Sequence, residues 1–127
     1  MLEHLNVREA LVGGAYSHAV LDGRYAFLAG QMAVDDVSRP PLGEIEGETR
    51  AAMGLLGAVL AARGLTFADV VRVGMFMTDL SEFERMNAVY ETYFAPGCLP
   101  ARTCVGVASL LGGSRIEIDC IARLPAA

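Results

Sequence analysis

The sequence contains no lysine, and its ten basic residues are all arginines. A mechanism that needs a lysine Schiff base, including covalent attachment of pyridoxal phosphate, is therefore excluded. Fifteen acidic residues bring the formal net charge to −5. This balance disfavours long-range attraction to nucleic acid, so we do not expect a nucleic-acid partner.

Cysteine and histidine are also scarce. The three cysteines, Cys98, Cys104 and Cys120, are an odd number without the spacing of a disulfide framework, which is typical of the reducing cytoplasm. The two histidines, His4 and His18, form no paired-ligand motif, so a zinc site is not expected. We predict a cytoplasmic protein without a metal or another cofactor.

Long hydrophobic runs are missing although the hydrophobic fraction is 54%. The longest apolar stretch, Ala51–Ala62, is too short to cross a bilayer, and the first residues lack the regions of a signal peptide. We expect no membrane partner. A single domain of 127 residues cannot hide this much apolar surface as a monomer, so the composition indicates a homo-oligomer with a core-like interface.

The N-terminal half predicts a β-hairpin and a helix. Asp22-Gly23 separates two strand-like runs, 16–21 and 24–29, and this dipeptide favours a two-residue turn. A surface loop is expected from Met32 to Gly43, where Pro40 and Pro41 occur. Apolar residues then recur every three or four positions from Glu44 to Arg63, which predicts a helix.

The C-terminal half predicts three strands and one helix. Residues 69–78 are apolar on both faces, as in a central strand. Ser81 and Glu84 have the spacing of a capping box at the start of a second helix, which carries Asn87, Tyr90 and Phe94 on one stripe. Two further strands, 100–107 and 115–122, flank the glycines of residues 110–114.

This order, strand-strand-helix-strand-helix-strand-strand, predicts an α+β fold in one domain of residues 1–127. Right-handed crossovers would give a mixed sheet with two helices on one face. The other face would stay uncovered and would meet neighbouring subunits.

Arg102 and Glu117 are the candidate functional pair. Strand alternation places Arg102 beside Cys104 on one face, and Glu117 beside Asp119. If the last two strands pair antiparallel with partner numbers that sum to an odd value, Arg102 and Glu117 share a face; an even sum separates them. Spacing alone leaves two readings open, a structural ion pair or a site that binds a carboxylate and polarises water.

The chain resembles the Rid (YjgF) family of reactive-intermediate deaminases from Gly14 to Ala122. The residues that carry the resemblance lie in a characteristic order: Gly14–Val20, Ala29–Gln31, Gly64, Asp69–Val71, Phe76, Asp79, Asn87, Tyr90, Phe94, Pro100–Cys104 and Ile116–Asp119. The resemblance implies a chorismate-mutase-like subunit that forms a homotrimer, with three active sites in clefts between subunits.

The resemblance also implies an activity, the hydrolysis of enamines and imines such as 2-aminoacrylate and 2-iminopropanoate to 2-keto acids and ammonia. Carried over by position, Arg102 binds the substrate carboxylate and Glu117 positions water. Tyr16 faces the substrate, Gly30 lies in the loop that closes the pocket, and the backbone of Cys104 contacts the ligand. A planar guanidinium suits bidentate binding of a carboxylate better than an ammonium group does.

Several positions depart from the family pattern, including Ala15 and Leu111, each where the family has a proline. Ala29 replaces a serine and so removes one hydroxyl from the site, and His18 replaces a glutamine, for which we favour a structural hydrogen-bonding role. Two alternatives to a deaminase follow, a non-catalytic module that binds small carboxylic acids and an endoribonuclease-type relative. The acidic composition argues against the second.

Overall fold

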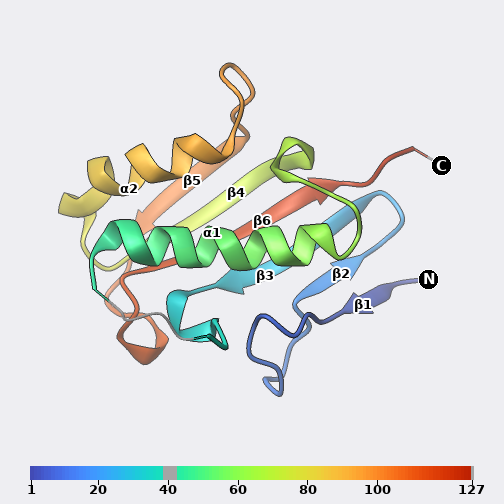
Figure 1. The fold of residues 1–127 in the computed structure, drawn as a ribbon, viewed down its shortest axis with the longest axis horizontal. Helices are drawn as coiled ribbons and strands as arrows, with labels where there is room; N and C mark the ends of the chain where they lie inside the picture. Colours follow the sequence, from blue (N-terminus) through green and yellow to red (C-terminus); the bar gives the residue numbers. More distant parts are fainter. Residues whose placement is uncertain (39–42, 127) are drawn as a thin grey trace.

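Six strands form one mixed sheet in the computed structural model, which describes residues 1–38 and 43–126. The strands are β1 (Glu3–Leu5), β2 (Ala19–Leu21), β3 (Tyr25–Gln31), β4 (Val70–Met77), β5 (Ala101–Gly106) and β6 (Ile116–Arg123). Their spatial order is β1-β2-β3-β6-β4-β5; β4 and β5 pair parallel, and all other neighbours pair antiparallel. Helices α1 (Ile45–Ala61) and α2 (Phe83–Tyr90) lie together on one face of the sheet (Figure 1). The predicted fold class is confirmed.

Helix α1 covers the middle of the sheet because one of its faces is apolar throughout. Met53, Leu56 and Leu60 are almost fully buried along that face. Glu46 and Glu48 occupy the first turn, where negative charge favours a helix N-terminus. The chain leaves the helix through Gly64, which adopts a positive φ of 70°.

Helix α2 starts differently from the capping box that the sequence predicts. The N–H of Ser81 donates to the Asp79 carboxylate at 2.9 Å, and a 3₁₀ turn from Leu80 to Glu82 leads into the helix. Asp79 is therefore the capping residue, and Ser81 donates to it instead of accepting from the backbone. A second 3₁₀ turn, Glu91–Tyr93, continues the helix towards Phe94.

The predicted hairpin is confirmed as β2 and β3, with the turn one residue further along the chain. The N–H of Asp22 donates to the carbonyl of Tyr25 at 3.1 Å, so Gly23 and Arg24 are the central turn residues. Gly23 has a φ of 95°, which a side-chain-bearing residue rarely adopts. The loop predicted for Met32 to Gly43 includes a 3₁₀ turn, η1 (Ala33–Asp35), and its residues 39–42 lie outside the described residues.

Strand β4 separates β5 from β6, so the direct antiparallel pairing considered for the last two strands is wrong. The α2 crossover returns the chain parallel to β4, and β6 then pairs on the other side of β4. Strand β4 is an inner strand but lies next to the edge strand β5, so its predicted central position holds only in part. Its helix-side face is apolar, whereas its open face carries the exposed Arg72. Val73, Met75 and Met77 pack under the helices.

The face opposite the helices has no second layer over it among the described residues. Cross-strand partners place Phe27, Phe76, Val105 and Ile121 on this open face, and Phe27 keeps 42% of its surface exposed. Glu117 lies on the same face, beside Phe76. Exposed apolar side chains gathered on a sheet face are typical of a surface that meets another protein chain.

Candidate functional site

The guanidinium of Arg102 is held against α2. Its Nη1 donates to Oδ1 of Asn87 at 2.7 Å. Its Cζ lies 4.8 Å from the ring centre of Tyr90 and 5.3 Å from that of Phe83, within cation–π range of both rings. Three side chains of one helix thus fix the orientation of the guanidinium.

Arg102 is fixed but not neutralised. Across residues 1–38 and 43–126, no carboxylate lies within ion-pairing distance of it. Asn87 occupies one Nη atom, and the remaining N–H groups are left for another acceptor. A cavity of about 250 Å³ adjoins the guanidinium, lined by Asn87, Tyr90, Glu91, Leu99, Pro100 and Arg102. We call Arg102, Asn87, Tyr90 and Phe83 the arginine half-site.

The carboxyl group of Glu117 lies directly over the backbone of Gly30. A Cβ atom on Gly30 would overlap Oε2 of Glu117, so only glycine permits this approach. The two residues come from neighbouring strands, β6 and the end of β3, where the strand register shifts. The structure therefore brings together two of the predicted site residues, Gly30 and Glu117.

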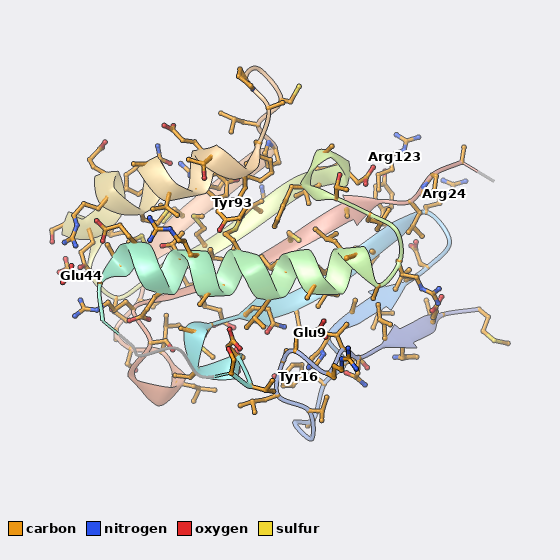
Figure 2. The ribbon with its side chains drawn as sticks, in the orientation of Figure 1. Glu9, Tyr16, Arg24, Glu44, Tyr93 and Arg123 are labelled. Carbon is orange, nitrogen blue, oxygen red and sulfur yellow. The ribbon has the colours of Figure 1, made fainter. Side chains whose placement is uncertain are left out.

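Tyr16 lies on the loop before β2, away from the hairpin turn where Arg24 is found (Figure 2). The residue is 49% exposed. Burial raises the pKa of its phenol, and the charges of Asp35 and Glu117 raise that pKa further, so the hydroxyl keeps its proton at neutral pH. Tyr16 thus lies within electrostatic reach of Glu117.

Two further carboxyl groups, those of Asp35 and Asp119, lie near that of Glu117. Partial burial raises the pKa of Glu117, and the negative charges of Asp35 and Asp119 add to this increase. The pKa values of Asp35 and Asp119 are also raised, chiefly by burial. We call Glu117, Tyr16, Gly30, Asp35 and Asp119 the carboxylate half-site; its raised basicity suits proton transfer.

The two half-sites lie on opposite faces of the sheet within one chain. Arg102 pairs in register with Val73, which is buried under the helices, whereas Glu117 pairs with Phe76 of the open face. The shared face considered for Arg102 and Glu117 is therefore wrong for a single chain, because the inserted strand β4 decides which face each residue occupies. An ion pair within the chain is excluded by the same geometry.

Cys104 lies beside Arg102 on the helix side and is partly buried. Burial raises the pKa of its thiol above the ordinary value, and the charge of Arg102 only partly opposes this. The thiol is therefore protonated at neutral pH and is a poor nucleophile. Burial raises the pKa of Cys120 to about 12.

The structural role favoured for His18 is confirmed. The N–H of Val7 donates to Nδ1 of the buried ring at 2.9 Å, and Nε2 contacts the carbonyl of Leu11 at 2.7 Å. An Nδ1 that accepts requires the tautomer that carries its proton on Nε2. His18 thus anchors the segment that leads to Tyr16.

Sequence reasoning missed two features of the site. The sequence placed Asn87 only on the apolar stripe of the second helix, but its side chain bonds to that of Arg102. Its common stripe with Tyr90, together with the core-side placement of Arg102, is the signal that could have indicated this contact. Asp35 was assigned only to a surface loop, and no local pattern reveals its proximity to Glu117.

No group of three or more His, Cys, Asp or Glu side chains within residues 1–38 and 43–126 is arranged to hold a metal ion. In the same residues, neither helix combines the length and apolar character needed to cross a bilayer.

Comparison with known proteins gives consistent matches along almost the whole chain. The model of the family described as Endoribonuclease L-PSP matches residues 7–124. The chain is 42% identical over 110 residues to the 2-iminobutanoate/2-iminopropanoate deaminase of Rattus norvegicus, covering 86% of this chain and 80% of the rat protein. It is 46% identical over 112 residues to Protein DfrA of Myxococcus xanthus, covering 86% of this chain and 85% of that protein.

The fold is also similar to solved structures. One is the crystal structure of E. coli TdcF with bound serine, which superposes with a TM-score of 0.89 at 28% sequence identity. The similarity covers 97% of this chain and 99% of TdcF.

Proposed function

The chain belongs to the Endoribonuclease L-PSP family, also known as the Rid or YjgF family, and on that basis we propose that it hydrolyses imines of small 2-amino acids. The observation that carries this proposal is the guanidinium of Arg102, which is fixed by Asn87 and two aromatic rings, lacks an ion-pair partner in the described residues and adjoins a cavity. Such a group binds a substrate carboxylate through two parallel hydrogen bonds. Curated relatives about 40% identical to this chain are named imine deaminases.

The active site is completed by two copies of the chain, in a homotrimer. Arg102 and Glu117 lie on opposite faces of one sheet, so a single chain cannot present both to one small molecule. The open face that carries Glu117 also carries Phe27, Phe76 and Val105 and is uncovered, which suits contact with another copy. Arg102 of one copy and Glu117 of its neighbour then line a shared cleft, with Tyr16 and Gly30 beside Glu117 and the backbone of Cys104 near the ligand.

The reaction needs one water molecule and no cofactor. Arg102 holds the carboxylate so that the imine carbon lies near Glu117. The ionised Glu117 accepts a proton from water as the water oxygen bonds to that carbon, and it passes this proton to the imine nitrogen. The hydroxyl proton of the resulting carbinolamine then moves through Glu117 to the nitrogen as the C–N bond breaks, so ammonia leaves and a 2-keto acid remains. An enamine substrate first gains a proton at carbon and loses one from nitrogen, and so becomes the imine.

A second candidate is a non-catalytic protein that binds small carboxylic acids. The crystal structure of E. coli TdcF has bound serine, which favours this alternative, since the arginine half-site of this chain would hold such a ligand. The absence of a serine hydroxyl at Ala29 also leaves fewer polar groups for catalysis.

Turnover of 2-aminoacrylate generated in situ by a dehydratase separates these candidates. We expect keto-acid release by the wild type to exceed the spontaneous rate at least tenfold, and Arg102→Ala to abolish this excess. The control Arg50→Ala removes an exposed arginine on α1 and should retain full activity. Keto-acid binding without accelerated turnover would support the binding protein and refute the deaminase.

A further inference from the structure

Asp35 is buried more deeply than its local role requires. The N–H of Met32 donates to Oδ2 of Asp35 at 2.9 Å, which caps the 3₁₀ turn η1. Asp69 makes the same contact in another 3₁₀ turn, where the N–H of Thr66 donates to its Oδ2 at 2.9 Å. Asp69 remains partly exposed, whereas Asp35 is 8% exposed. Capping alone therefore does not account for the burial of the Asp35 carboxylate, which costs solvation energy.

Turn η1 places Asp35 between two parts of the carboxylate half-site, the Gly30–Glu117 contact and the segment that leads to Tyr16. Turn η1 follows β3 directly, only a few residues after Gly30, over which the Glu117 carboxyl group lies. The carbonyl of Asp35 accepts a hydrogen bond from the N–H of Leu11 at 2.7 Å, which fastens η1 to the segment that leads to Tyr16. The negative charge of Asp35 raises the pKa values of both Glu117 and Tyr16.

The other charged groups near Asp35 and Glu117 do not cancel the repulsion between these two carboxylates. Asp119, on the same strand as Glu117, adds a second negative charge there, and Arg72 on β4 acts on Asp119. In the tautomer that its hydrogen bonds require, the ring of His18 is neutral and does not compensate the charge of Asp35. Only a protonated His18 would lower the pKa of Asp35. Within residues 1–38 and 43–126, no arginine or histidine forms an ion pair with Asp35 or Glu117.

We propose that Asp35 is a positioning residue of the site, which never touches substrate and acts through the charge that it places beside Glu117. This inference rests on the proposed function, in which Glu117 accepts a proton from water. A neighbouring negative charge makes Glu117 a stronger base than an isolated carboxylate. Asp35 thereby helps Glu117 to accept that proton and to release it to the departing nitrogen.

Titration of Glu117 by carbon-detected NMR tests this coupling without any substrate. The variant Asp35→Asn keeps an oxygen that caps Met32 but loses the charge. We expect the titration midpoint of Glu117 to fall by roughly half a pH unit in Asp35→Asn. The matched control Asp69→Asn makes the same change in the other capped 3₁₀ turn and should leave the midpoint unchanged. Equal midpoints in wild type and Asp35→Asn would overturn the proposal.

If Asp35→Asn fails to fold, the variant Glu117→Gln tests the same coupling from the other side. Coupling between two groups is mutual, so Glu117→Gln should lower the midpoint of Asp35 by the same amount. An unchanged Asp35 midpoint in folded Glu117→Gln would overturn the proposal equally.

Kinetics separate this inference from the proposed function. If the chain is a deaminase, the acidic limb of its kcat/KM profile should move to lower pH in Asp35→Asn by the shift seen in the titration. One pH unit below the wild-type midpoint, the variant would then retain roughly threefold more of its maximal activity than the wild type. A merely structural role would lower activity equally at every pH, and this result would overturn the positioning role. Absence of turnover in the wild type, with the titration shift intact, would refute the deaminase and preserve the coupling.

Discussion

Asn87→Asp should supply Arg102 with a permanent counter-ion and so weaken the binding of anionic ligands. Oδ1 of Asn87 already lies 2.7 Å from Nη1 of Arg102, so an aspartate reaches the guanidinium without rearrangement. Full charges about 4 Å apart interact with about 4 kcal/mol at an effective dielectric constant of 20. Because Arg102 is partly exposed, solvent screening reduces this to about 1–2 kcal/mol. A keto acid has to compete with that interaction.

Isothermal titration with 2-oxobutanoate measures this competition. We expect the Kd of Asn87→Asp to rise about 10-fold, since each 1.4 kcal/mol corresponds to a factor of ten. The thermal midpoint of unfolding should stay equal or rise, because the new ion pair stabilises the folded chain. Loss of affinity without loss of stability is the signature of a neutralised binding arginine.

Two further variants make the result specific. Ala88→Asp adds the same charge one position along α2, on an exposed residue, and should leave the Kd within about twofold. Asn87→Ala removes the contact but adds no charge, so we expect a smaller increase in Kd, about threefold. An unchanged Kd in Asn87→Asp, with the fold intact, would refute the assignment of Arg102 as the carboxylate-binding group.

Two other predictions concern Glu117. Gly30→Ala places a Cβ where the Glu117 carboxyl group lies, so kcat should fall about 100-fold with little change in KM. The control Gly54→Ala, whose added Cβ has open space, should have no effect on kcat. Equal kcat values for Gly30→Ala and the wild type would contradict the proposed contact. The raised pKa of Glu117 contributes stability that is fully present below its unfolded pKa of about 4.3 and is lost as pH rises through the folded value. Glu117→Gln should therefore raise the thermal midpoint by roughly 2 °C at pH 7 and not at pH 4, and a destabilised variant at pH 7 would oppose this reasoning.

Local sequence patterns predicted the elements and the faces of individual strands. The 3.6-residue period of α1 and the turn glycine Gly23 are local signals, and both predictions are confirmed within about two residues. Alternation likewise placed Arg102 with Cys104, and Glu117 with Asp119, on common faces. These features depend on residues close together in the sequence.

The arrangement of the strands could not be predicted in the same way. The insertion of β4 between β5 and β6 depends on the α2 crossover, which is a non-local feature. This insertion places Arg102 and Glu117 on opposite faces of the sheet. Strand β1 was missed because it has only three residues and pairs with β2 across a long loop. The proximity of Asp35 to Glu117 also requires the folded sheet.

Mixing two inactive variants tests most directly whether the site is built from two copies of the chain. Arg102→Ala and Glu117→Ala each lack one half-site, and a mixed trimer regains a complete site wherever an intact Arg102 meets an intact Glu117 on the neighbouring copy. After denaturation and joint refolding in equal amounts, we predict recovery of about a quarter of the wild-type deaminase activity. Arg102→Ala refolded with the double variant should recover none. Joint refolding of the two single variants without any recovered activity, although mixed trimers form, would contradict the account.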